Sequence, residues 1–337
     1  NKVEEEEHAK NIILMIGDGM GVSQIYAGMT ANHGSLNITG LKHIGFQKTY
    51  SSDNYTTDSA ASGTAIATGT KTKNGMIGMS PDSVVVKNIL EIAEENGLST
   101  GLVSTSAITH ATPASFIAHQ VNRGMYEAIA ADFLKTDIEV FIGGGTKHFT
   151  EREDGKNLLP DFEAKGYTVF TDLDSAMEHD TEKMIVLTAD VHNPRYSEGR
   201  GDMLPLATAK AISILDKNPD GFFLMVEGSQ IDWGCHANNI DYITEETIDF
   251  DRAVGKALEF AEKDGETLVI ITADHECGGL ALNNGDFESG KIDAGYTTGS
   301  HTGVMVPVFA YGPGAEEFMG VYENADLFNK YKKVYGF

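Results

Sequence analysis

The sequence predicts an α/β protein built as a three-layer sandwich, in which helices cover both faces of a central, mostly parallel sheet. Short apolar runs alternate with segments of helical periodicity along the chain, as expected for such a sandwich. Several of these runs are apolar almost throughout, among them NIILMI, GFFLMV and TLVIIT. Such runs are typical of parallel strands that are buried on both faces.

The individual elements follow from these two patterns. We expect strands over residues 11–16, 43–49, 100–105, 139–142, 184–187, 222–226, 267–272 and 307–311. We expect helices over residues 23–31, 59–68, 84–96, 125–134, 204–215, 240–262 and 323–332. The stretches 143–160 and 283–300 are predicted to be surface loops. No internal repeat or low-complexity linker interrupts the pattern, so we expect a single domain over residues 8–337 with short surface insertions.

The charge balance excludes several classes of binding protein. The 337 residues carry 50 Asp and Glu against 25 Lys and Arg, which gives a net charge of −25. Binding a nucleic acid requires clustered Lys and Arg, and docking on anionic lipid requires a polybasic segment. No apolar run approaches the roughly 18 residues that a membrane-spanning helix needs. We therefore expect no nucleic-acid-binding surface and no membrane span.

The glycine and proline contents are unusual. The chain has 37 glycines and only 8 prolines among its 337 residues, whereas glycine averages about 7% of residues and proline about 5%. Such a chain is more flexible when unfolded and has looser loops. Cold adaptation and a glycine-rich active site explain this composition equally well.

Acidic residues follow three of the strongest predicted strands directly. Asp18 follows NIILMIG, Glu227 follows GFFLMV, and Asp274 with His275 follows TLVIITA. Ligands of open parallel sheets lie beyond the carboxyl ends of the strands. A single carboxylate there is ordinarily a helix cap or a turn residue. Three of them at one edge, two flanked by glycine, indicate a metal site.

Further candidate ligands lie in two short segments. Asp232 and His236 are four residues apart in EGSQIDWGCH, so one helical turn places them on the same face. His301 lies in the small-residue loop GSHTG. Asp, His and Glu side chains suit Zn²⁺, and sets of oxygen atoms alone suit Mg²⁺.

Ser59 opens a predicted helix within the small-residue run TDSAASGTA. A serine at this place is ordinarily a helix N-cap. A helix N-terminus also stabilises an alkoxide or a bound phosphate, so beside Zn²⁺ this serine would be a plausible nucleophile.

Seven motifs between residues 11 and 314 resemble, in kind and in order, those of the alkaline phosphatase family. They are IGDGMG, TDSAAS, HATP, AHQVNRG, EGSQIDWGCH, TADHE, and GSHTG followed by AYGPG. The chain looks most like the short bacterial members, including cold-adapted ones. The resemblance implies an alkaline-phosphatase-like fold and the hydrolysis of many phosphate monoesters to inorganic phosphate.

The resemblance also implies roles for particular residues. Ser59 matches the nucleophile that forms a phosphoserine intermediate, and Arg123 matches the guanidinium that binds two phosphate oxygens. The implied cofactors are two Zn²⁺ and one Mg²⁺ per chain. Their matched ligands are Asp232, His236 and His301 for the first zinc; Asp274, His275, Asp18 and Ser59 for the second; and Asp18, Thr112 and Glu227 for magnesium.

Two residues depart from the best-known enterobacterial pattern of the family. His110 stands where that pattern has an acidic residue, and Trp233 stands where it has Lys. We expect both to contribute, with Arg123, to substrate binding. The missing carboxylate should weaken Mg²⁺ binding or admit another divalent ion. The missing Lys charge should loosen phosphate binding and speed product release.

Family resemblance further implies a homodimer in the periplasm or secreted from the cell. A phosphodiesterase or a metal-dependent mutase of the same superfamily is the alternative enzyme, although Arg123, Thr112 and Glu227 favour a monoesterase. A non-catalytic metal- or phosphate-binding protein is disfavoured because every catalytic position carries a competent residue. A purely structural protein finds no support in the sequence.

The remaining polar residues receive simpler predictions. Cys235 and Cys277 both flank candidate metal ligands, and either a disulfide or two independent thiols is possible. The acidic segment 241–251 is expected to be a solvated helix face. His119 is a weak candidate for supporting Arg123. Six further histidines are expected at the surface or in turns, namely His8, His33, His43, His148, His179 and His192.

Overall fold

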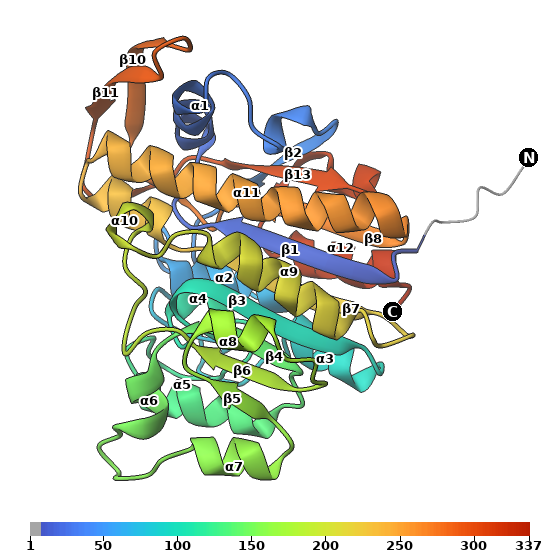
Figure 1. Cartoon of the computed structure of the whole chain (residues 1–337). Coiled ribbons are helices and arrows are strands. Elements are labelled where there is room, and N and C mark those ends of the chain that lie inside the picture. The colour runs from blue at the N-terminus through green and yellow to red at the C-terminus, as the bar shows by residue number, and fades with distance from the viewer. Residues whose placement is uncertain (1–7) are drawn as a thin grey trace, which may run out of the picture.

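The computed structural model describes residues 8–337, which build a ten-stranded central sheet (Figure 1). Neighbouring strands are parallel except that β13 runs antiparallel to both β2 and β8. The order across the sheet is β14 (Gly320–Glu323), β2 (His43–Lys48), β13 (Val306–Tyr311), β8 (Thr267–Thr272), β1 (Asn11–Gly17), β7 (Phe222–Gly228), β3 (Ser99–Ala107), β4 (Val140–Gly144), β6 (Met184–Leu187) and β5 (Thr168–Phe170).

Helices cover both faces of this sheet, which confirms the predicted three-layer sandwich (Figure 1). Alternate side chains of β1 enter two different apolar cores: Ile12, Leu14 and Ile16 enter one, and Ile13 and Met15 the other. The first core is covered by α2 (Ser59–Thr68), α3 (Ile89–Glu95), α4 (Ala111–Ala114), α5 (Tyr126–Asp132), α6 (Thr146–Thr150), α7 (Leu159–Ala164) and α12 (Asp326–Tyr335). The second is covered by α1 (Val22–Ala31), α8 (Leu173–Met177), α9 (Met203–Leu215), α10 (Gln230–His236) and α11 (Ile240–Asp264).

The eight predicted strands are all present; two have the predicted bounds, and the ends of the others differ by at most two residues. Helix α2 has the predicted bounds. The helix predicted over 84–96 is wrong at its start, because Val85 bridges to Met79 and Asn88 begins α3 with a capping box to Glu91. The helix predicted over 323–332 starts later because Glu323 ends strand β14.

Both predicted surface loops contain regular structure. Most of 283–300 belongs to the hairpin of β10 (Leu280–Asp286) and β11 (Lys291–Tyr296), which projects at one end of the molecule (Figure 1). Its Phe287 packs edge-on against Tyr26 of α1 at 6.0 Å between ring centroids. Helix α6 and the start of α7 lie within 143–160. These elements are short, so their periodicity is too brief to read from sequence.

The prediction of a solvated face over 241–251 is wrong for three of its carboxylates. Glu246, Asp249 and Asp251 are buried. Arg200 lies between the first two, donating from Nη1 to Glu246 Oε1 at 3.1 Å and from Nη2 to Asp249 Oδ2 at 2.9 Å. Asp251 accepts from the backbone N–H of Ile38 at 3.0 Å. Acidic residues on this helix therefore serve as internal anchors for neighbouring segments.

Membrane insertion finds no support among the described helices. The 25-residue α11 is the longest of those that the structure assigns over residues 8–337, and it carries charged residues along its length. No helix in this part of the chain combines the length and the apolar character that crossing a bilayer requires.

Substituting Arg200 should be strongly destabilising. The variant Arg200→Met leaves Glu246 and Asp249 buried without their counter-charge, and we expect the free energy of unfolding to fall by about 3–5 kcal/mol. Urea denaturation measures this change. Arg252→Met is the matched control, because Arg252 pairs with Asp202 at the surface and should cost less than about 1 kcal/mol. Equal effects of the two substitutions would contradict a structural role for the buried pair.

Glu139, next to β4, should make stability depend on pH. Burial raises its pKa from 4.5 to about 7, and Glu94 adds repulsion, although the N–H of Thr100 and Lys183 oppose the shift. A carboxyl with a raised folded pKa contributes stability below its unfolded pKa, and that contribution is lost as the pH rises towards 7. Glu139→Gln should therefore gain about 1–2 kcal/mol relative to the parent between pH 4.5 and 7.

Urea denaturation across this pH range checks the expectation. Glu182→Gln, at an exposed position, serves as the control and should follow the parent at every pH. A constant difference between Glu139→Gln and the parent would show that Glu139 does not titrate in this window.

Candidate metal centre

The carboxyl ends of three adjacent strands bring acidic side chains together. Strand β1 lies between β8 and β7, and its Ile16 is in register with Thr272 and Glu227. The chain continues from β1 into Asp18 and from β8 into Asp274, while Glu227 lies near the end of β7. All three side chains are buried. Parallel alignment therefore creates the acidic edge that the sequence predicts.

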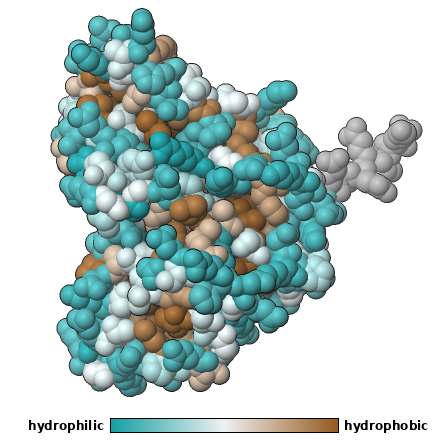
Figure 2. Space-filling view, viewed as in Figure 1, coloured by the Kyte–Doolittle hydropathy of each residue, from teal (hydrophilic) through white to brown (hydrophobic). Residues whose placement is uncertain are grey.

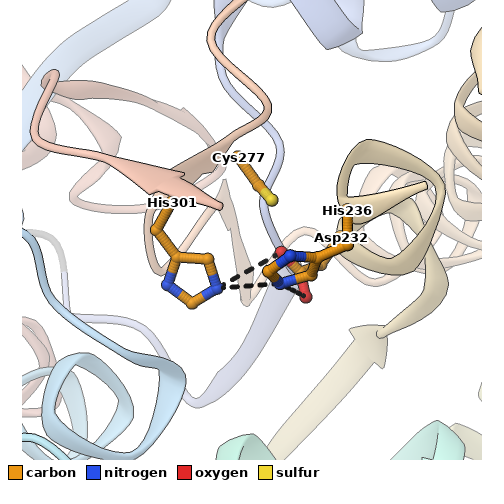
Figure 3. Close-up of side chains that lie close together, drawn as sticks. All are labelled: Asp232, His236, Cys277 and His301. Atoms are coloured by element: carbon orange, nitrogen blue, oxygen red, sulfur yellow. Dashed lines mark hydrogen bonds and ion pairs between the residues drawn. The ribbon is translucent and has the colours of Figure 1, made fainter. Parts of the chain in front are cut away.

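A first set of ligand atoms comes from α10 and from β12 (His301–Thr302). Figure 3 shows Asp232 and His236 facing His301 across a small gap. His236 Nε2 lies 3.2 Å from His301 Nε2 and 3.2 Å from Asp232 Oδ2, and His301 Nε2 lies 3.5 Å from Asp232 Oδ1. Metal–ligand bonds of about 2.0–2.1 Å in a tetrahedron separate ligand atoms by about 3.3 Å. The residues therefore fit Zn²⁺.

Backbone carbonyls orient both imidazoles of this set. Nδ1 of His236 lies 2.8 Å from the carbonyl oxygen of Gly299, and Nδ1 of His301 lies 2.9 Å from that of Thr57. A carbonyl accepts, so Nδ1 donates in each ring and Nε2 faces the gap. Burial lowers the pKa of His301 to about 4, which leaves its Nε2 with a lone pair. The bond to Asp232 raises the pKa of His236 to about 9, so a bound cation would displace the proton on its Nε2. Such outer hydrogen bonds fix the tautomer that a metal ligand requires.

A second set lies beside the first and is fully buried. His275 Nε2 is 3.3 Å from Asp18 Oδ1, 3.3 Å from Asp274 Oδ2 and 3.3 Å from Ser59 Oγ. These separations again match the edges of a tetrahedral metal site. The His275 ring stacks on His301 with 3.6 Å between centroids, so the two sets are adjacent.

A third group offers oxygen atoms alone. Glu227 Oε1, Thr112 Oγ1 and both carboxylate oxygens of Asp18 are buried without a hydrogen-bond partner. The other oxygen of Glu227 accepts from Ser104 at 2.6 Å and from Ser229 at 2.7 Å. Buried oxygens without donors are costly, and a hard cation such as Mg²⁺ would satisfy them.

The electrostatics of the centre show an excess of buried negative charge. Burial raises the pKa of Glu227 to about 7 and that of Asp274 to about 6, and the charge of Asp232 adds to the shift of Asp274. Burial and the Asp274 charge also raise the pKa of Asp18. Asp232 differs, because its bond from His236 and the charges of His275 and His301 outweigh burial and lower its pKa. Bound cations would stabilise the charged form of every carboxylate here.

Ser59 is presented at the N-terminus of α2 by a residue that sequence reasoning missed. Asp58 caps this helix by accepting from the backbone N–H of Ala61 at 2.9 Å. Its other oxygen accepts from Arg123 Nη1 at 3.0 Å and from the N–H of Gly75. Asp58 therefore fixes the serine and the guanidinium relative to each other. Its N-cap position before the small-residue run was the available signal.

An aromatic group lies beside the centre. Trp233 is 6.2 Å from His110 and 4.9 Å from His192 between ring centroids, with near-perpendicular planes. His192 is half-buried, and its Nδ1 accepts from the N–H of Ala107 at 3.0 Å. Burial and the charge of Arg123 lower the pKa of His110 to about 3, so this imidazole is neutral.

Three expectations about histidines need correction. His192 was expected at the surface or in a turn; it lies in a bend, but it is half-buried and packs against Trp233. His148 is also half-buried, bonds to Thr109 and stacks on Tyr126. Histidines in packed aromatic groups carry no periodic signal that distinguishes them from turn residues. His119 bonds to Gly78 and Glu91, contacts unrelated to Arg123.

Both cysteines are buried free thiols, so the disulfide alternative is not realised in the structure. Gln24 Nε2 lies 3.6 Å from Cys235 Sγ. Cys277 lies with the first set of ligand atoms.

Buried carboxylates and imidazoles at the carboxyl ends of a parallel sheet, around a serine at a helix N-terminus, define a metal-dependent hydrolase. More narrowly, the chain belongs to the alkaline phosphatase family, whose model matches residues 9–291. It is 34% identical to alkaline phosphatase 4 of Bacillus subtilis, with 99% of this chain and 90% of that protein covered. It is 36% identical to alkaline phosphatase of Escherichia coli, with 98% and 87% covered.

Solved structures agree with this membership. The alkaline phosphatase from the Antarctic bacterium TAB5 superimposes with a TM-score of 0.93 at 46% identity, covering 99% of both chains. A His-to-Asp mutant of that enzyme, described with Mg bound in the M3 site, superimposes equally well. A cold-active alkaline phosphatase from a Shewanella species gives a TM-score of 0.89 at 31% identity. The protein is therefore a phosphoric monoester hydrolase that depends on metal ions.

Proposed function

We propose that the protein hydrolyses phosphate monoesters through a phosphoserine intermediate on Ser59, with low specificity for the alcohol. The observation that carries the proposal is the position of Ser59 Oγ, 3.3 Å from His275 Nε2 at the start of α2. There the hydroxyl lies beside the imidazole of the second set of ligand atoms and at the positive end of the helix dipole.

The cofactors in this proposal are two Zn²⁺ and one Mg²⁺ per chain. When bound, they polarise phosphoryl oxygens and lower the pKa of a coordinated hydroxyl or water. The proposed ligands are Asp232, His236 and His301 for the first zinc; Asp274, His275, Asp18 and Ser59 for the second; and Asp18, Thr112 and Glu227 for magnesium. The matching atom separations and the unpartnered oxygens described above support this assignment.

In the proposed reaction Ser59 Oγ loses its proton to water and attacks phosphorus, and the bond from phosphorus to the ester oxygen breaks. The departing alkoxide takes a proton from water and leaves as the alcohol. Water then hydrolyses the phosphoserine and releases inorganic phosphate, which restores the serine hydroxyl. Arg123 binds two phosphate oxygens, because its planar guanidinium matches their spacing. Asp58 holds that guanidinium through Nη1 and leaves its remaining donors for phosphate. These contacts address the phosphoryl group and not the alcohol, which accounts for low specificity.

Trp233 and His110 are proposed to contribute to substrate binding. His110 lies close enough to Arg123 for the guanidinium charge to lower its pKa, and Trp233 packs edge-on against His110. His110 is neutral and Trp233 is uncharged, so neither adds positive charge for phosphate. We also propose a homodimer of single-domain chains outside the cytoplasm. Kinship with bacterial alkaline phosphatases supports this location.

The proposed function is tested by hydrolysis of an aryl phosphate monoester against the matching diester at alkaline pH. We expect monoester turnover that is lost on chelation and returns with Zn²⁺ and Mg²⁺ together. Ser59→Ala should lower kcat by at least about a thousandfold, because the nucleophile is removed. Ser52→Ala, at an exposed position, is the control. Preference for the diester would contradict the proposed role of Arg123, and absence of turnover with metals restored would contradict catalysis.

Trp233→Lys should strengthen product inhibition. A lysine here adds a positive charge near bound phosphate, and a partly exposed ion pair contributes about 1 kcal/mol. We expect the inhibition constant for inorganic phosphate to fall about fivefold. Steady-state inhibition measures it, with Trp233→Gln as the uncharged control of reduced size. If both variants shift the constant alike, then loss of the indole, and not the charge, determines phosphate affinity.

A further inference from the structure

Cys277 lies among the ligand atoms of the first set. Asp232, His236, His301 and Cys277 each offer one ligand atom, and these four atoms all lie within 4.8 Å of one another. Figure 3 shows the sulfur of Cys277 projecting toward the carboxylate of Asp232, opposite the two imidazoles. Three of the four residues have a role in the proposed function, whereas Cys277 has none.

The backbone holds the cysteine in this position. Cys277 ends the short strand β9 (Glu276–Cys277) and is paired directly with His301 of the antiparallel strand β12. Directly opposed residues of an antiparallel pair project to the same side. The N–H of Cys277 donates to the carbonyl of Gly19 at 3.2 Å, and the side chain is fully buried. The sulfur therefore stays near the imidazole that it faces.

A second observation is that one buried oxygen among these ligand atoms has no hydrogen-bond donor. Asp232 Oδ1 is buried without a hydrogen-bond donor, and His301 Nε2 lies 3.5 Å from it. Nδ1 donates to a carbonyl in each ring, so Nε2 of both His301 and His236 faces the same space. One carboxylate oxygen, two imidazole nitrogens and one thiol thus converge on that space.

We propose that Cys277 is a fourth protein ligand of this set, which lets Asp232, His236, His301 and Cys277 enclose a soft divalent ion such as Cd²⁺. The proposal rests on the assignment of the first three residues to a metal in the proposed function. Thiolate ligands favour soft ions, whereas a site of nitrogen and oxygen ligands discriminates less.

Coordination by Cys277 changes no oxidation state. The S–H bond breaks, the proton passes to water, and the sulfur electron pair forms the bond to the metal. Four protein ligands complete a tetrahedron, as in structural metal sites, whereas a catalytic site keeps one position open for water or substrate. The enclosed ion therefore has no position for a phosphoryl oxygen. Soft ions should accordingly hold the enzyme in an inactive state.

Cys235 provides the matched control. It is also buried and free, and Gln24 Nε2 lies 2.8 Å from the carbonyl oxygen of Cys277 and 3.6 Å from Cys235 Sγ, so the two cysteines lie in the same part of the core. Its sulfur lies beside the amide of Gln24 and does not belong to the four-atom group. Replacing either cysteine removes one thiol from the same part of the core, but only Cys277 is a proposed ligand.

The experiment titrates Cd²⁺ into metal-free protein whose two thiols have been confirmed as reduced. We expect a thiolate-to-cadmium charge-transfer absorption in the parent and in Cys235→Ser, and its loss in Cys277→Ser. Competition with a chelator should show Cd²⁺ affinity at least about tenfold lower in Cys277→Ser. Mutating a residue that only hydrogen-bonds to a metal ligand typically lowers metal affinity 10–100-fold, and the loss of a ligand itself should cost at least as much. Circular dichroism confirms that the variants fold.

The cadmium NMR resonance of the parent protein gives a test that needs no variant, because a thiolate ligand shifts it away from the position of a nitrogen and oxygen set. Absence of the absorption in the parent, or its persistence in Cys277→Ser, would overturn the inference. Aryl phosphate hydrolysis by the same preparations loaded with zinc and magnesium separates the two proposals. Turnover without the cadmium absorption overturns only the role of Cys277, and absorption without turnover contradicts only the proposed function.

Discussion

The repulsion among carboxylates buried at one edge of the sheet is the constraint on which the rest of the structure depends. Parallel alignment of β8, β1 and β7 forces Asp274, Asp18 and Glu227 into the same low-dielectric space. Without cations their pKa values rise, and several oxygens lack any donor. Such an arrangement is costly for an empty fold and favourable for one that binds cations. The metal dependence of the family thus follows from the sheet topology.

Three consecutive residues connect this acidic edge to Arg123, the proposed phosphate ligand. The carbonyl of Thr57 orients His301, the carboxylate of Asp58 pairs with Arg123, and the hydroxyl of Ser59 lies beside His275. Each partner comes from a distant part of the chain. The start of α2 therefore sets the geometry of the site as a unit, and a shift there would disturb the proposed metal ligands, the proposed nucleophile and Arg123 together.

Charged side chains also organise the molecule away from the centre. Arg200 joins two carboxylates of α11, and Asp251 anchors the segment that begins at Asn37. An acidic helical segment predicts a solvated face, because the sequence shows its charges but not the distant residues that pair with them. The same lack of partner information concealed Asp58 and His192. Asp58 pairs with Arg123 and Asp249 pairs with Arg200, each about 50 or more residues away along the chain. His192 accepts from the backbone N–H of Ala107.

The sequence by itself determined the sandwich, the strands of its sheet and the identity of the acidic and imidazole residues after them. Continuous apolar runs reveal parallel strands, and strand ends reveal where ligands gather, because both signals are local. Only the tertiary structure decided which ligand atoms meet, that both cysteines are free, and that Cys277 joins Asp232, His236 and His301. Those outcomes depend on the pairing of β9 with β12 and on the approach of Thr57 to His301 and of Ser59 to His275. Contacts between segments this far apart leave no periodic trace in the chain, so tertiary packing alone sets them.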